Sequence, residues 1–126
     1  MTVFFRGRIT PDYIPLVRDF FVVDAAGDIP IEAILDTGFS GQVTLRVPRS
    51  VRPLGQFELI GVTNYELASG EVIRVELFKA AIRLGRRRLS VDASFTDSNV
   101  GMIGLQLIDG KRAIFDLKRY AFRVLD

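Results

Sequence analysis

Short runs of β-favouring apolar residues, interrupted by Gly, Pro and Asp, recur along this chain of 126 residues. Runs of this kind are typical of all-β barrels and sandwiches. We expect strands at residues 2–9, 17–24, 29–35, 42–47, 55–63, 71–84, 88–95, 112–117 and 120–125. The helical candidates are one turn at 48–54 and a short segment at 105–108. Because no linker, repeat or low-complexity segment divides the chain, the sequence predicts a single domain over residues 1–126.

The segment 71–84 changes its pattern partway along. Apolar residues occupy odd positions up to Leu77 and even positions from Phe78 onward. Strand side chains alternate with a period of two, so this change predicts a bulge or a strand that crosses between sheets. Ser69-Gly70, just before it, predicts a hairpin tip. The pattern indicates a long hairpin whose far end projects beyond its sheet, with an ordinary exposed hairpin as the alternative.

Cys and His are both missing from the sequence, and their absence excludes whole classes of chemistry. Without Cys there is no disulfide, thiolate nucleophile or Cys-ligated zinc, and without His the Ser-His-Asp and Cys-His systems are excluded. Ordinary histidine metal ligation is excluded too. An enzyme built from this chain must therefore use carboxylates, hydroxyls, Lys or Arg, and we expect neither a metal nor another cofactor.

Charge and hydropathy indicate which classes of binding partner the chain is expected to have. The net charge is only +2, and the cluster Arg86-Arg87-Arg88 follows Gly85 as expected for a solvated hairpin turn. One such triplet is a weak signal for phosphate, so we expect no nucleic-acid partner. No run approaches the roughly 20 apolar residues of a membrane span, and the first residues lack a signal-peptide pattern, so we expect a cytoplasmic protein without a membrane partner. Hydrophobic residues make up 48% of the chain, which an oligomer that buries extra apolar surface would explain.

The stretch Ile34-Leu35-Asp36-Thr37-Gly38 leads a strand directly into a carboxylate. A strand-ending turn is one interpretation of it, since Asp and Gly favour turns. Burying a carboxylate at the end of an apolar strand is costly unless it is hydrogen-bonded or paired, so catalysis is the other interpretation. The pattern of two apolar residues followed by Asp-Thr-Gly resembles the active-site signature of aspartic proteases.

Two further features extend this resemblance over roughly residues 15 to 125. Met102-Ile103-Gly104 resembles the apolar-apolar-Gly element that supports the catalytic loop in that family. The projecting hairpin lies between the two elements in sequence, where the family has its flap. The chain thus resembles the single-domain, retropepsin-like aspartic proteases. The resemblance implies an all-β, closed acid-protease-type barrel with a flap hairpin and one short C-terminal helix.

The same resemblance implies an endopeptidase that acts as a homodimer on peptide or protein substrates. Two carboxylates that share one proton would activate a water molecule. This chain supplies Asp36 alone, because Asp97-Ser98-Asn99 lacks the Gly and is expected to be a loop. The second carboxylate would be Asp36 of another copy, brought close by twofold symmetry.

The resemblance also gives each neighbour of Asp36 a role. Thr37 would hydrogen-bond to the partner loop, and Gly38 would allow a close backbone approach. The residues implied to support the active loop are Ile34, Leu35, Ile103 and Gly104. The residues implied to bind substrate are Phe39, Ser40, Ala68, Ser69 and Gly70, the last three as the flap tip. Tyr65 is either a flap hydroxyl or, as we expect, a packed aromatic residue.

Departures from the family pattern leave alternatives open. Phe39 stands where the family usually has Ala or Ser, so its bulk would narrow the cleft. Ser40 and Leu105 occupy positions where viral members often pair Asp with Arg, which favours a cellular relative over a viral one. A non-catalytic dimeric barrel that binds peptide or protein is the main rival, and a basic barrel that binds nucleic acid is a weaker one. The sequence leaves open whether the terminal strands pair within one chain or between two chains.

Overall fold

The computed structural model describes residues 2–24, 27–38, 45–51 and 58–126. These residues form an all-β molecule, with two short 3-10 helices, η1 (Arg49–Val51) and η2 (Leu105–Ile108). The strands are β1 (Val3–Ile9), β2 (Pro15–Val17), β3 (Phe20–Asp24), β4 (Gly27–Pro30), β5 (Ala33–Leu35), β6 (Leu45–Pro48), β7 (Glu58–Glu66), β8 (Val72–Leu84), β9 (Arg87–Thr96), β10 (Gly101–Ile103), β11 (Arg112–Asp116) and β12 (Ala121–Leu125). None of the helices in the described part of the chain has the length and apolar character needed to cross a membrane.

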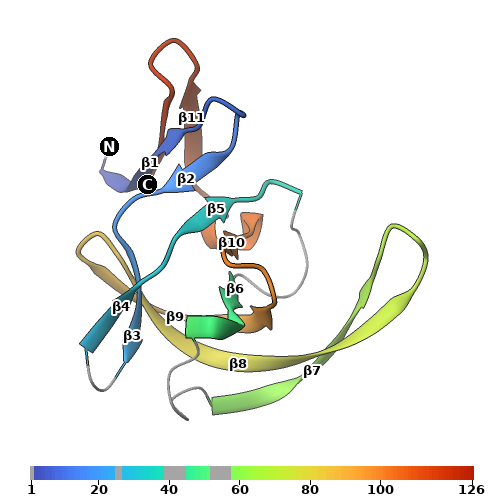
Figure 1. Cartoon of the computed structure of the whole chain (residues 1–126). Helices are drawn as coiled ribbons and strands as arrows, with labels where there is room; N and C mark the ends of the chain where they lie inside the picture. The colour runs from blue at the N-terminus through green and yellow to red at the C-terminus, as the bar shows by residue number, and fades with distance from the viewer. Residues whose placement is uncertain (1, 25–26, 39–44, 52–57) are drawn as a thin grey trace.

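The strands form one strongly curled sheet, which Figure 1 shows wrapping around the middle of the molecule. Its order is β11-β12-β1-β2-β5-β10-β6-β9-β8-β3-β4, and β7 pairs only with β8. Among the described residues β11 and β4 end this path without pairing to each other, so the closed barrel that we expected is not formed by strand pairing. The expected C-terminal helix is instead the 3-10 turn η2, which covers four residues.

Two predicted strands are each divided into two. Residues 17–24 contain the end of β2 and all of β3, because Asp19 between them has a positive φ of 54° that turns the chain. Residues 29–35 contain the end of β4 and all of β5, and Ile31 between them is buried, its amide donating to Phe20 O at 2.9 Å. Each break lets the chain leave one strand pair and join another.

The core lies on one face of the curled sheet. One row of it runs from strand to strand through paired residues, and every member of the row is at most 6% exposed. The row consists of Leu35, Ile103, Leu45, Ala93 and Phe78. Burying large apolar side chains of this kind stabilises the fold by roughly 1.5–3 kcal/mol each.

The hairpin β7–β8 projects from the rest of the sheet, as Figure 1 shows. The predicted change of pattern in β8 is confirmed, since Val75 and Leu77 are half-buried whereas Phe78 and Ala80 are buried. β8 itself stays regular, and the bulge lies opposite it in β7, between Leu59 and Gly61. The change marks the point where β8 leaves β9 and pairs with β7 alone.

The terminal strands pair within one chain. β1 runs antiparallel to β12, with Gly7 opposite Phe122, and the Asp126 amide donates to Thr2 O at 2.9 Å. β11 and β12 form the predicted hairpin, whose turn has Asp116 Oδ1 accepting from the Lys118 amide at 3.1 Å. This outcome decides the pairing that the sequence left open.

Candidate active site

Asp36 follows directly after β5 and is held there by a neighbouring strand. β10 runs parallel to β5, with Met102 opposite Ile34 and Ile103 opposite Leu35. The Asp36 amide then donates to Ile103 O at 2.9 Å, which extends this pairing by one bond. The backbone of Asp36 is therefore fixed by the same element, Met102-Ile103-Gly104, that the sequence predicted as its support.

The side chain of Asp36 is half-buried and arranges its own turn. The Gly38 amide donates to Asp36 Oδ1 at 3.0 Å, while Thr37 and Gly38 are exposed. A Cβ added to Gly38 would come no closer than 3.4 Å to any atom outside its neighbours, and that atom is Asp36 Oδ1. We expected a Cβ at Gly38 to clash with neighbouring backbone. Within one described chain, such a Cβ would only touch the Asp36 carboxylate at ordinary contact distance.

Gly101, at the start of β10, is a site residue that the sequence reasoning missed. A Cβ there would lie 2.9 Å from Arg46 O and 3.5 Å from Ala33 Cβ, so β5 and β6 leave no room for one. The sequence does place a Gly directly before Met102-Ile103. The reason for this Gly is visible only in the structure, where β10 pairs with β5 on one side and β6 on the other.

An apolar groove of about 680 Å³ opens beside Asp36. Its walls come from the end of β1, the turn before β2, β5 and the β11–β12 hairpin. The residues that line it are Ile9, Tyr13, Ile14, Pro15, Ile34, Leu35, Asp36, Thr37, Phe115 and Leu117. Within the described part of the chain, Asp36 is the only carboxylate of this groove.

The tip of the β7–β8 hairpin contains three of the five residues predicted to contact substrate, Ala68, Ser69 and Gly70. The Gly70 amide donates to Leu67 O at 2.8 Å and the Leu67 amide to Glu71 O at 2.7 Å, closing the turn around Ala68 and Ser69. Gly70 has a φ of +86°, a conformation that other residues adopt only with strain. The tip residues Leu67–Gly70 are all exposed.

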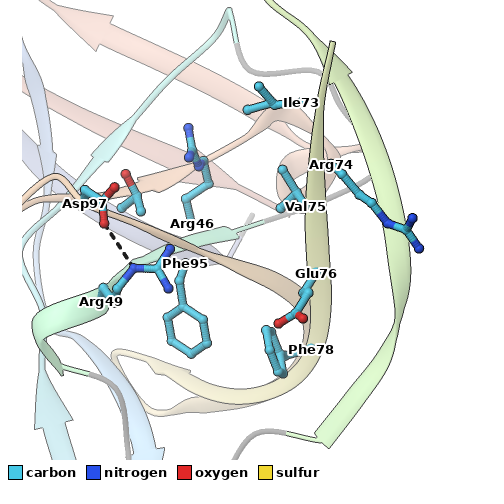
Figure 2. A pocket seen from close by; sticks show the side chains of 10 residues that line it. Arg46, Arg49, Ile73, Arg74, Val75, Glu76, Phe78, Phe95 and Asp97 are labelled. Atoms are coloured by element: carbon cyan, nitrogen blue, oxygen red, sulfur yellow. Dashed lines mark hydrogen bonds and ion pairs between the residues drawn. The ribbon is translucent and has the colours of Figure 1, made fainter.

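A second pocket, of about 440 Å³, lies between β8 and the ends of β6 and β9. Figure 2 shows Ile73 and Val75 of β8 facing Arg46 of β6 across it. Arg49 and Asp97 also line this pocket, and Arg49 Nε donates to Asp97 Oδ1 at 3.0 Å. Asp97 does not line the groove of Asp36.

Tyr65, on β7 of the β7–β8 hairpin, is half-buried. Burial raises the pKa of its hydroxyl, and the nearby Arg46 charge partly opposes the rise. The sequence interpretation of Tyr65 as a packed aromatic agrees with this burial. Phe39 and Ser40, the other predicted substrate contacts, lie outside the described residues.

The described acidic residues form no cluster of three that would hold a metal ion. What the site offers chemically is a carboxylate with a fixed backbone, an apolar groove beside it, and a hairpin that extends from the same sheet. A positioned carboxylate of this kind can act as a general acid or base.

Comparisons with known proteins bear on the fold. No protein-family model matches the chain, and no curated protein sequence matches it. The crystal structure of a retropepsin-like aspartic protease from Rickettsia conorii matches with a TM-score of 0.60 and 12% sequence identity, over 94% of this chain and 87% of that one. The chain therefore has the fold of the retropepsin-like aspartic proteases.

Proposed function

We propose that this protein is an aspartic endopeptidase, active as a homodimer, that uses Asp36 from each of two copies. The observation that carries the proposal is the position of Asp36 at the end of β5, with its amide bonded to Ile103 O at 2.9 Å and its carboxylate beside an apolar groove. A structural aspartate in a turn would not need a parallel strand to fix it or a groove beside it. The retropepsin-like fold supports the same conclusion.

The need for a dimer follows from the chemistry. Aspartic-protease catalysis requires two carboxylates close together, and the groove offers only Asp36 among its described residues. Asp97 is bonded to Arg49 and is absent from that groove. A twofold axis beside Asp36 would supply an identical carboxylate from a second copy.

The surface around Asp36 is suited to such a contact. Tyr13 is 67% exposed, Leu117 57% and Phe115 44%, and all three line the groove of Asp36. Large exposed apolar side chains that gather in one place commonly mark an interface. The exposed hydroxyl of Thr37 would then be free to hydrogen-bond to the partner loop.

In the proposed mechanism the two carboxylates share one proton. The ionised carboxylate takes a proton from a bound water molecule while the water oxygen attacks the carbonyl carbon of the substrate. The other carboxylic acid donates its proton to the carbonyl oxygen, giving a tetrahedral diol. When the C–N bond breaks, one diol hydroxyl returns its proton to a carboxylate and the other carboxyl proton goes to the departing nitrogen. The pair again holds one proton at the end.

The hairpin β7–β8 would act as the flap in this scheme. Ala68, Ser69 and Gly70 at its tip would cover the bound peptide and exclude water from the reacting centre. The supporting residues Ile34, Leu35, Ile103 and Gly104 would keep the two loops in place beneath it.

The test is cleavage of a mixed peptide library by the wild type and by Asp36→Asn, from about pH 3.5 to about pH 8. The wild type is expected to cleave and Asp36→Asn to lose at least about a thousandfold in rate, with its fold retained because Asn is nearly isosteric. Asp97→Asn is the control and is expected to cleave normally. Cleavage by Asp36→Asn would remove this residue from the mechanism. Binding of library peptides without cleavage at any pH would favour the non-catalytic peptide-binding barrel.

A further inference from the structure

A second row of side chains crosses the sheet beside the core row and faces the other way. It runs through paired positions from Ile34 of β5 to Met102 of β10, Arg46 of β6 and Ser94 of β9. Ile34 lines the groove of Asp36, and Arg46 lines the pocket under β8. The row therefore joins the two hollows, and Arg46 is its charged member.

Arg46 is only half-exposed, yet its guanidinium lacks a protein partner among the described residues. Its Nε is buried and has no hydrogen-bond partner there, and none of the ion pairs between described residues includes it. By contrast, Arg49 in the same pocket is bonded to Asp97 at 3.0 Å. A buried guanidinium N–H without an acceptor costs folding free energy. A ligand that brings an acceptor to Arg46 would remove this cost, which favours its binding there.

Ser94, opposite Arg46 on β9, carries a second unused polar group. It is 1% exposed, and its Oγ is buried without a hydrogen-bond partner among the described residues. Ser94 does not line the pocket, so a ligand there would meet Arg46, and an unpaired guanidinium N–H favours an anionic oxygen ligand over an apolar one.

We propose that Arg46 forms a subsite that binds the side-chain carboxylate of an Asp or Glu in the peptide substrate. This inference rests on the proposed function and names a substrate class for it. β6 lies two strands from β5, roughly 10 Å at the usual strand spacing. An extended peptide rises about 3.3 Å per residue, so the selected residue lies within about three positions of the cleaved bond.

The other charges of this pocket leave Arg46 available. Asp97 is occupied by Arg49, and Glu76 and Arg74 are exposed on β8. Figure 2 shows the guanidinium of Arg74 extending away from Arg46. Arg74 is therefore a matched control, a cation of the same pocket whose guanidinium does not face the row.

The experiment starts from a library peptide that the wild type cleaves. Each position within about three residues of the cleaved bond is replaced in turn by Glu, Gln or Lys, and kcat/KM is measured for each peptide. Because each copy of the homodimer carries one Arg46, the wild type is expected to prefer Glu to Gln by about tenfold or more at one position on each side of the cleaved bond, as a charge-assisted hydrogen bond allows. Arg46→Met is expected to bring this ratio near one, Arg46→Glu to favour Lys, and Arg74→Met to keep the wild-type ratio. An unchanged ratio in Arg46→Met would overturn the subsite while leaving the protease intact.

A binding measurement separates the subsite from catalysis. Fluorescently labelled Glu and Gln versions of the library peptides are titrated onto Asp36→Asn protein, with and without Arg46→Met, and followed by anisotropy. Tighter binding of a Glu peptide that Arg46→Met abolishes would support the subsite, even in a chain that never cleaves. Equal affinity for Glu and Gln peptides, or no peptide binding, would overturn it.

Discussion

At Gly7 of β1 the chain has no room for any side chain. A Cβ there would lie 2.0 Å from Leu16 O and 2.4 Å from the Phe122 ring, between β2 and β12. Because a backbone oxygen cannot give way without moving its strand, Gly7→Ala is expected to destabilise the protein by about 3 kcal/mol or more. Chemical denaturation gives the free energy of unfolding directly.

Gly61 of β7 is the matched control for this substitution. A Cβ there would meet nothing within 4 Å, so Gly61→Ala is expected to change the free energy of unfolding by less than about 1 kcal/mol. If Gly7→Ala and Gly61→Ala lowered the free energy of unfolding equally, the close packing described around Gly7 would be contradicted.

Individual site residues differ in how far the sequence alone predicts them. Asp36 could be predicted because its context is local, an apolar strand that runs straight into Asp-Thr-Gly. The proximity of Met102-Ile103 to it could be proposed only through the family resemblance, and the parallel pairing of β10 with β5 confirms that proximity. Arg46 carries no local signal at all, since the subsite proposed for it follows from its place in a row that crosses four strands.

At the scale of elements, the hairpin β7–β8 was the most predictable part of the chain. Its Ser-Gly tip and the change of pattern near Leu77 are both local features, and both appear in the structure. β10 was not predicted as a strand because three residues are too few to show a period. The open order of the sheet was not predicted either, since it depends on which distant strands pair.

The proposed flap tip gives a prediction at this scale. Gly70 has a φ of +86° and its Cβ position is open, so Gly70→Val strains the turn without a clash. We expect the variant to lower kcat/KM several-fold by misplacing the tip, while its melting temperature stays near that of the wild type.

Gly110 provides the comparison for Gly70. It has a similar φ of +75° and open space around it, but it lies in the turn after η2 and lines neither hollow of the site. Gly110→Val is expected to leave kcat/KM unchanged. If both variants lose activity alike, then the loss reflects general strain and the hairpin is not a flap.

At the scale of the whole molecule, ion pairs join Asp126, the last residue, to two segments that are distant from it in sequence. Asp126 pairs with Arg87 and, at 3.7 Å, with Lys111. The hydrogen bond from Arg87 lowers the pKa of the Asp126 carboxyl and raises the pKa of the guanidinium. A carboxyl with a lowered pKa in the folded state stabilises the fold above its ordinary pKa, and this contribution is lost as the pH falls through the lowered value.

Asp126→Asn is therefore expected to lower the melting temperature at pH 7 and to lose this difference in acid. Melting curves of the two proteins from pH 7 down to about pH 2 should converge. Asp12→Asn is the control, because Asp12 is exposed and forms no ion pair with any described residue. A difference that persists unchanged at the lowest pH would show that the ion pair is not its source.

The proposed dimer can be tested through its apolar surface. Leu117 is 57% exposed in the groove of Asp36, so Leu117→Glu would place a charge in the interface while leaving the core of one chain untouched. Analytical ultracentrifugation is expected to find the variant monomeric where the wild type is dimeric, with loss of cleavage. If Leu117→Glu remained dimeric, the interface would have to lie on another surface of the molecule.

The central claim is that one active site is built from two copies of Asp36, and mixing subunits tests it most directly. A fixed amount of wild type is mixed with about a ninefold excess of Asp36→Asn, left to exchange, and assayed for cleavage of one peptide. With random pairing only about a tenth of the wild-type chains keep a wild-type partner, so activity should fall to about a tenth. Activity that does not change with added Asp36→Asn, in a mixture shown to exchange subunits, would contradict the shared site.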